Sequence, residues 1–272
     1  MEVVAVDWSG ARDPAGQRRH LWMATARDGA LTDLSGGRTR AEVVQALIER
    51  RGEVGTLVVG LDFAFGFPAW FTRELGLSSA PALWAHVGER GEHWLQTCES
   101  PFWGRPGVRR PELPDHFRQT DLDNAPAKSV FQIGGAGAVG TGSIRGMPYL
   151  QVLREAGFAI WPFDAPTRSL VVEIYPRALT GPVTKKRIED RTRYLGSAPM
   201  ARRLRARARS SEDAFDAAIS ALAMDRAAEG FARLGRAEDP VELLEGAIWV
   251  PGRLRAGPQA LVTDAAGTSG AP

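Results

Sequence analysis

EVVAV at residues 2–6 is followed by Asp7, and TLVVGLD at residues 56–62 ends in Asp62. Both runs are short, apolar and rich in β-branched residues, which is typical of strands buried inside a sheet. Buried strands of this kind belong to sheets that helices cover on both sides, which defines the α/β class. The sequence therefore predicts an α/β protein in which an aspartate follows each of two buried strands.

The segment between these two runs predicts two hairpin strands and one helix. Residues 19–27 read as a second strand, Asp28-Gly29 as a hairpin turn, and residues 30–35 as a third strand. Residues 39–51 repeat apolar side chains at helical spacing, and Gly52 follows them. The predicted order up to residue 62 is therefore β-β-β-α-β.

The remaining chain predicts more helices than strands. We expect helices at 69–76, 82–97, 143–156, 184–195, 199–209 and 211–230, and strands at 129–133, 158–163 and 169–175. Residues 99–127 carry five prolines and read as a long loop or an insertion. We expect one domain over residues 1–255, with an insertion at about 69–157, and a disordered Gly/Ala/Pro/Ser-rich tail at 256–272.

Composition excludes several classes of protein. The chain has 272 residues, of which 44% are hydrophobic and 24% are charged, as in ordinary globular proteins. Cys98 is the one cysteine, which excludes an intrachain disulfide and a multi-cysteine zinc site. No apolar run approaches the roughly 20 residues that cross a bilayer, and the N-terminus lacks the pattern of a signal peptide. A cytoplasmic location without membrane contact is the resulting expectation.

Basic residues are concentrated in one segment. Residues 185–209 contain ten Lys or Arg residues but only two acidic ones, Glu189 and Asp190. Such a cluster is typical of proteins that bind polyanions, although a solvated helix face has the same composition. Arginine dominates, because only three lysines (Lys128, Lys185, Lys186) occur among 34 Lys and Arg residues.

Four carboxylates are candidates for one anionic site. Asp7 and Asp62 follow predicted strands, Glu173 lies in the predicted strand LVVEIY, and Asp216 lies on a predicted helix whose face continues through small residues. Ligands of open α/β sheets sit beyond the carboxyl ends of the strands. Carboxylates without a nearby His or Cys suit Mg²⁺ or Mn²⁺, and one or two such ions can activate water for attack on a phosphodiester. Asp213 is expected to stabilise the helix start instead.

Several of these segments resemble the domain-of-unknown-function 429 family, which is regarded as a family of predicted nucleases. The similar segments are VVAVDWSGA, LVVGLDFAFGFP, KSVFQIGGAGAVGTGSIRGMPYL, GFAIWPFD, VVEIYPRALTG and DAFDAAISALA, within residues 2–251. The resemblance implies a ribonuclease H-like fold: a mixed five-stranded sheet in the order 3-2-1-4-5, flanked by helices, with a helical and loop insertion after the fourth strand.

The acidic pattern is also similar to RuvC-type resolvases. The resemblance implies that Asp7 bridges the metals and that Asp62 and Asp216 are ligands, whereas Glu173 follows the nuclease family's own pattern. RuvC-type proteins carry Glu where this chain carries Asp62, so the number of metal ions stays open.

The glycine-rich segment 134–146 allows two interpretations. Its Gly135-Ala-Gly137-Ala-Val-Gly140 matches G-x-G-x-x-G, but its mid-chain position and Pro148 disfavour a dinucleotide site. We favour either a backbone loop that contacts phosphate or a tight packing turn. Candidate substrate-binding residues are Lys128, Arg145, Arg177, Lys185 and Lys186.

The function predicted from sequence is a metal-dependent nuclease in which a metal-activated water hydrolyses nucleic acid. Asp7, Asp62, Glu173 and Asp216 are its candidate catalytic residues and metal ligands. Two alternatives remain: a non-catalytic module that binds nucleic acid, and an ATP-dependent phosphotransferase, because Asp7-Trp8-Ser9-Gly10 partly matches the D-x-G-x-T phosphate loop of actin-like kinases.

Overall fold

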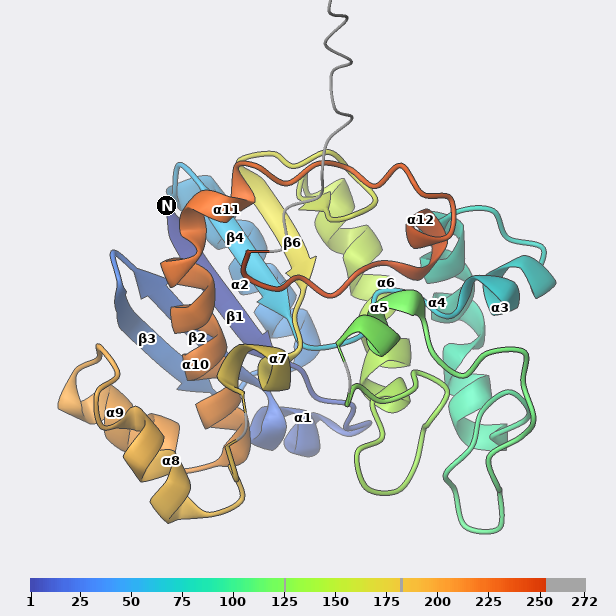
Figure 1. The fold of residues 1–272 in the computed structure, drawn as a ribbon, viewed down its shortest axis with the longest axis horizontal. Helices are drawn as coiled ribbons and strands as arrows, with labels where there is room; N and C mark the ends of the chain where they lie inside the picture. Colours follow the sequence, from blue (N-terminus) through green and yellow to red (C-terminus); the bar gives the residue numbers. More distant parts are fainter. Residues whose placement is uncertain (125, 182, 253–272) are drawn as a thin grey trace, which may run out of the picture.

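The computed structural model describes residues 1–124, 126–181 and 183–252. Within these ranges a mixed six-stranded sheet has the order β3-β2-β1-β4-β6-β5 (Figure 1). β1 pairs antiparallel with β2 and parallel with β4, and β4 pairs parallel with β6. The carboxyl ends of β1, β4 and β6 therefore lie at one edge of the sheet. The strands are β1 Glu2–Asp7, β2 Trp22–Arg27, β3 Ala30–Gly36, β4 Leu57–Leu61, β5 Ala159–Ile160 and β6 Ser169–Glu173.

Helices occur between the strands and after the last strand, β6. The first two are α1 Pro14–His20 and α2 Arg40–Glu53. Those between β4 and β5 are α3 Ala69–Glu74, α4 Ala80–Thr97, α5 Gln119–Asp123 and α6 Gly140–Glu155. Those after β6 are α7 Pro176–Thr180, α8 Ile188–Leu195, α9 Arg202–Arg209, α10 Glu212–Arg226, α11 Ala228–Phe231 and α12 Glu242–Glu245. None of the helices in the described ranges is long and apolar enough to cross a membrane.

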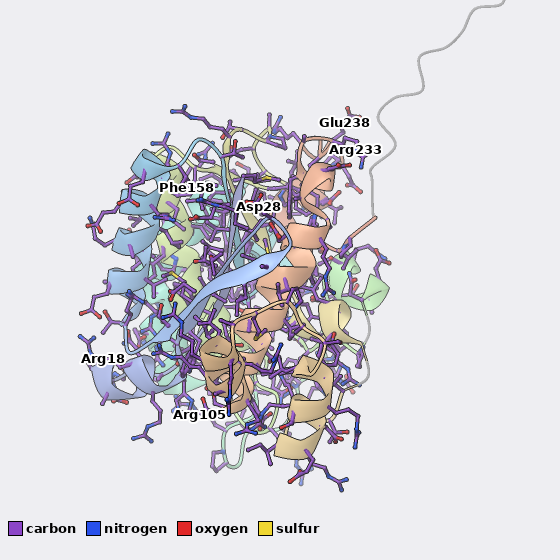
Figure 2. The ribbon with its side chains drawn as sticks, turned by 90° about the vertical axis from the view of Figure 1, so that its left-hand side faces the viewer. Arg18, Asp28, Arg105, Phe158, Arg233 and Glu238 are labelled. Atoms are coloured by element: carbon purple, nitrogen blue, oxygen red, sulfur yellow. The ribbon has the colours of Figure 1, made fainter. Side chains whose placement is uncertain are left out.

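The sheet separates two apolar layers, because successive strand residues point to opposite faces. Val4 and Val6 of β1 belong to the layer that contains α2, here called the α2 face. Val3 and Ala5 belong to the layer that contains α10, here called the α10 face. Figure 2 shows α2 and α10 on opposite sides of the sheet. The helices between β4 and β5 extend the α2 layer, since Trp84 of α4 and Leu150 of α6 are part of the same apolar cluster.

The predicted β-β-β-α-β order is confirmed for the first four strands and α2. The five-stranded order 3-2-1-4-5 is not confirmed, because the two-residue β5 pairs with the outer side of β6 and adds a sixth strand. β5 is shorter than the predicted strand 158–163 because the Asp164 carboxylate accepts a hydrogen bond from the Ile160 N–H at 3.1 Å and closes a turn.

Two local predictions were wrong. Residues 129–133 form no strand and contribute one isolated bridge, between Gln132 and Trp103. The Ser129 hydroxyl accepts a hydrogen bond from the Phe131 N–H at 3.2 Å, which favours a turn over a sheet ladder. Residues 19–20 end α1 instead of starting β2, and the sequence analysis missed this helix, which Asp13 caps at Gly16. The predicted disordered tail, 256–272, lies outside the described residues.

Candidate active site

The pairing of β1 with β4 positions Asp7 and Asp62. Val6 and Leu61 are partners in the parallel register, and the Asp62 N–H donates to the Val6 carbonyl oxygen at 3.1 Å. Val6 and Leu61 both belong to the α2 face. Alternation therefore directs the next residue of each strand, Asp7 and Asp62, toward the α10 face.

α10 brings a third carboxylate to the same place. The helix begins after Ser211, whose hydroxyl accepts a hydrogen bond from the Ala214 N–H at 3.0 Å. Close approach to the sheet requires small residues, and a Cβ at Gly60 of β4 would lie 2.5 Å from the Met224 Sδ. The Asp216 side chain is thereby buried beside the ends of β1 and β4. Asp213, by contrast, pairs with His20 at 3.0 Å near the helix start.

Asp7, Asp62 and Asp216 form what we call the acidic cluster. Burial raises the pKa of Asp7 well above its ordinary value, and the charges of Asp62 and Asp216 raise it further. Burial and the Asp216 charge raise the pKa of Asp62 to about 8. Burial also raises the pKa of Asp216, although Lys185 opposes this effect. The three groups thus repel one another in a poorly hydrated site, and ionising all of them requires added positive charge.

Lys185 supplies one positive charge to the acidic cluster. Its ammonium group donates a hydrogen bond to the Asp216 Oδ2 and also interacts electrostatically with Asp7 and Asp62. The backbone of Lys185 is fixed, because the buried Arg191 guanidinium donates to its carbonyl oxygen at 2.5 Å and to that of Arg209 at 3.0 Å. Lys185 was predicted to contact substrate, and the structure places it against a candidate metal ligand.

Glu173 points away from the acidic cluster, although it lines the same cavity as Asp62 and its charge contributes to the raised pKa of Asp62. It is the register partner of Leu61, and both point to the α2 face. There the Glu173 carboxylate accepts from Arg118 at 2.6 and 2.8 Å and from the Phe65 N–H at 2.9 Å. Arg118 also binds Asp121 at 2.8 Å, and all three side chains are buried. Glu173 therefore anchors the segment before α5 to β6, and both of its oxygens already accept hydrogen bonds.

A cavity of about 320 Å³ opens beside Asp62. Its walls include Trp8 after β1, Tyr175 after β6 and Lys128, together with the first turn of α6 at Thr141 and Gly142. Lys128 is exposed and extends along Gly137, where a Cβ would lie 3.3 Å from its Cε. A larger cavity of about 1030 Å³ is bordered by α5, α12 and residues 232–239, and contains no member of the acidic cluster.

The glycine-rich segment is a packing turn that leads into α6. A Cβ at Gly140 would lie 2.2 Å from the Val130 carbonyl oxygen, and one at Gly134 would lie 2.4 Å from that of Gly104. A dinucleotide motif needs a strand before the glycines, and residues 129–133 form none. Packing therefore explains these glycines, while the start of α6 still lines the cavity beside Asp62.

The other predicted substrate-binding residues differ in their freedom to contact a ligand. Arg145 is engaged, because it pairs with Glu92 at 2.6 Å and donates to the Gly10 carbonyl oxygen. Arg177 is exposed and donates to the Val183 carbonyl oxygen at 3.1 Å. Lys186 is exposed next to Lys185.

Sequence analysis missed Arg118 and Asp121, which lie in the proline-rich segment. The available signal was the spacing of Arg118 and Asp121, which lie three residues apart at the start of a short helix and form an ion pair. It also missed Arg40, whose buried guanidinium donates to the Ser9 and Ala11 carbonyl oxygens at 2.8 Å and fixes the loop after Asp7.

The arrangement provides oxygen donors of the type that hard cations prefer. Within the described ranges, however, no three His, Cys, Asp or Glu side chains stand ready to enclose a metal ion. Lys185 instead contributes the positive charge. Comparison with known proteins gives no relative, since no family model, curated protein or solved structure matches the chain.

Proposed function

We propose that this protein is a divalent-metal-dependent phosphodiesterase that hydrolyses nucleic acid at the acidic cluster. The observation that carries the proposal is the convergence of Asp7, Asp62 and Asp216, from β1, the end of β4 and α10, in one site where Asp7 and Asp216 are buried and Asp62 is half-buried. Three mutually repelling carboxylates at the carboxyl edge of parallel strands are costly unless they bind cations. Groups with strongly shifted pKa values beside a cavity are typical of functional sites.

The donor chemistry of the cluster fits Mg²⁺ or Mn²⁺. Carboxylate oxygens are the ligands that these ions prefer, and the Lys185 ammonium shows that a cation is accommodated there. Asp7, Asp62 and Asp216 would hold the ion. When bound, such an ion supplies a Lewis acid that activates water and stabilises charge on a phosphate. Glu173 is left out of the proposed ligand set, because Arg118 donates to both of its oxygens and neutralises its charge.

The cavity beside Asp62 is the proposed place of the scissile phosphate. Asp62 forms one wall, and the exposed Lys128 forms another. Thr141 and Gly142, in the first turn of α6, line the same wall, and this helix has no side-chain cap. A helix start favours an anion, and Lys128 adds a full positive charge. Phosphate would thus lie between a positive wall and the acidic cluster.

Exposed arginines next to the cluster favour a nucleic-acid substrate. We define the basic surface as Arg187, Arg193, Arg202, Arg203, Arg207 and Arg209, all exposed on or beside α8 and α9. These helices lie at the lower left of Figure 1, near the end of α10 that carries Asp216. Arg191 and Arg205 are not part of this surface, since they donate to backbone carbonyls. Contacts of this type recognise backbone phosphates without reading base sequence.

We further propose that the fold is ribonuclease H-like and that the chain is a member of the domain-of-unknown-function 429 family. The antiparallel β3-β2-β1 unit, the parallel addition of β4 and the position of β6 beside β4 support this assignment. In this interpretation β6 is the fifth strand of the family sheet, and the two-residue β5 is an addition at its edge.

Cleavage assays test the proposal directly. Purified protein is incubated with single-stranded, duplex, hybrid and branched nucleic acids in Mg²⁺, Mn²⁺ or EDTA. We expect cleavage only with metal. The cleavage rate should fall more than about 100-fold in Asp7→Asn and Asp216→Asn, because mutation of even the outer-shell partners of metal ligands lowers metal affinity or activity by about 10- to 100-fold. Asp225→Asn is the matched control: it lies near the other end of α10, where Asp225 accepts from the Gly29 N–H. Cleavage that persists in EDTA or in Asp7→Asn contradicts the proposal.

A non-catalytic module is the second candidate, because Lys185 already pairs with Asp216. This alternative predicts salt-sensitive nucleic-acid binding that is unchanged in Asp216→Asn and does not require metal. ATP-dependent phosphotransfer predicts thermal stabilisation by ATP, which the same protein preparations can test.

A further inference from the structure

We propose that Lys185 is a displaceable counter-cation of the acidic cluster, so that a divalent ion binds only by expelling the Lys185 ammonium from Asp216. This inference rests on the proposed function and concerns the regulation of the same site. It treats Lys185 as a positioning residue that controls access of the ion.

The first observation is the place of the ammonium group. It donates to the Asp216 Oδ2, and its charge acts on Asp7 and Asp62 as well. Because the ammonium is bonded to Asp216, an ion that takes Asp216 as a ligand would stand where the ammonium stands. Two cations cannot occupy that place together, because they would repel each other at short distance.

The second observation is the contrast between the backbone and the side chain of Lys185. Arg191 is buried and holds the Lys185 carbonyl oxygen at 2.5 Å, so the backbone is fixed. The Lys185 side chain, however, is 43% exposed, whereas that of Asp216 is 5% exposed. The ammonium can therefore leave toward solvent by rotation of its own side chain, while the carboxylate stays in place.

The third observation is the electrostatic balance of the cluster. One ammonium charge faces three carboxylates, of which Asp7 and Asp216 are buried and Asp62 is half-buried. His20, which is exposed and pairs with Asp213 at 3.0 Å, and the arginines of the basic surface also lie near this end of α10. A divalent ion brings twice the charge of Lys185 to the same carboxylates, so it can replace the ammonium as their counter-charge.

Amine labelling of the intact protein tests the exchange, because the chain has only three lysines. The protein is treated with a limiting amine-reactive reagent with and without Mn²⁺, and the modification of each lysine is measured by peptide mass spectrometry. We expect Mn²⁺ to increase modification of Lys185 at least about threefold and to leave the exposed Lys128 and Lys186 within about 1.5-fold. Mg²⁺ is the second ion, and K⁺ at matched ionic strength is the control.

Calorimetric titration with Mn²⁺ provides an independent measurement. Lys185→Met removes the charge and keeps an unbranched side chain one heavy atom shorter, and Lys186→Met is the matched control at the neighbouring exposed position. We expect Lys185→Met to bind Mn²⁺ about tenfold more tightly than the wild type, and Lys186→Met to bind within about twofold. The labelling measurement on the wild type does not depend on whether Lys185→Met folds.

The outcomes separate this inference from the proposed function. If the wild type binds Mn²⁺ but Lys185 labelling and the affinity of Lys185→Met are unchanged, the exchange is refuted and the metal-dependent enzyme survives. If only Lys185→Met binds Mn²⁺, the exchange is supported, since Lys185 then blocks the site. If neither protein binds Mn²⁺, both the exchange and the metal-dependent function are refuted.

Discussion

The substitution Asp62→Asn tests whether burial and the Asp216 charge raise the pKa of Asp62 in the acidic cluster. A pKa of about 8 for Asp62, in place of the ordinary 3.8, means that the folded protein holds a proton that the unfolded chain releases near pH 4. The free energy of unfolding therefore falls as pH rises from about 4 to about 8, by about 1.4 kcal/mol per pH unit. Between pH 6 and pH 8 the contribution from Asp62 is a loss of about 2 kcal/mol, because the slope falls to half as pH reaches the folded pKa.

Asparagine has nearly the same shape and does not titrate. In EDTA, the free energy of unfolding of Asp62→Asn, measured with urea, should fall by about 2 kcal/mol less than that of the wild type between pH 6 and pH 8. Groups common to both proteins cancel in this comparison, apart from the part of the Asp7 shift that Asp62 causes. Adding Mn²⁺ at pH 8 should restore the wild type more than the variant, because the ionised carboxylate binds the ion.

Equal pH dependence of the wild type and Asp62→Asn would refute this reasoning. It would show that Asp62 ionises in the folded protein as easily as in the unfolded chain, and that the cluster is better hydrated than its burial indicates. Asp225→Asn, on α10 but remote from the cluster, should show the wild-type pH dependence and serves as the control.

Three further predictions concern the remainder of the structure. Glu173→Gln should lower the free energy of unfolding by about 3 kcal/mol, since it leaves a buried Arg118 charge with one partner fewer; a loss below about 1 kcal/mol in urea unfolding would contradict this. Gly10→Ala should lower the free energy of unfolding by about 1–3 kcal/mol, because its Cβ would lie 2.8 Å from the Gly142 nitrogen. In Gly52→Ala, on α2, the new Cβ meets nothing within 4 Å, so the free energy of unfolding should rise by up to about 1 kcal/mol. Equal effects of the two substitutions in thermal unfolding would refute the packing argument. Combined Arg202→Ala, Arg203→Ala and Arg209→Ala should reduce the slope of log affinity against log salt by about 0.9 for each lost duplex contact, and Arg73→Ala with Arg90→Ala, exposed on α3 and α4, should not.

The four strands and α2 of the first 62 residues were predictable because local pattern and sheet geometry agree there, whereas the short α1 was missed. The β-branched runs before Asp7 and Asp62 form β1 and β4, and the parallel pairing of these strands places their ends side by side. Helical spacing on α10 likewise indicated that Asp216 belongs to the face with the small residues, which is the buried one.

The sequence did not indicate the register of β6 against β4, which decides the face of the sheet on which Glu173 lies. Asp62 follows the residue that pairs with Glu173, so the two acids differ by one position along the sheet edge. A difference of one residue moves a side chain to the opposite face. Arg118 was hidden for another reason: its partners, Glu173 and the Glu245 carbonyl oxygen, come from distant parts of the chain. Only tertiary structure brings them to the proline-rich segment.

The location of Asp216 on α10 links the chemistry of this protein to its core. Ten of the fifteen residues of this helix are buried, and they pack against the same strands that carry the other acids. Rotation of α10 by a single position would turn Asp216 away by about 100° and would also expose alanines now in contact with the sheet. Mutations that repack this layer should therefore disturb the site before they unfold the protein, and a screen for stabilising substitutions is best confined to the opposite layer around α2.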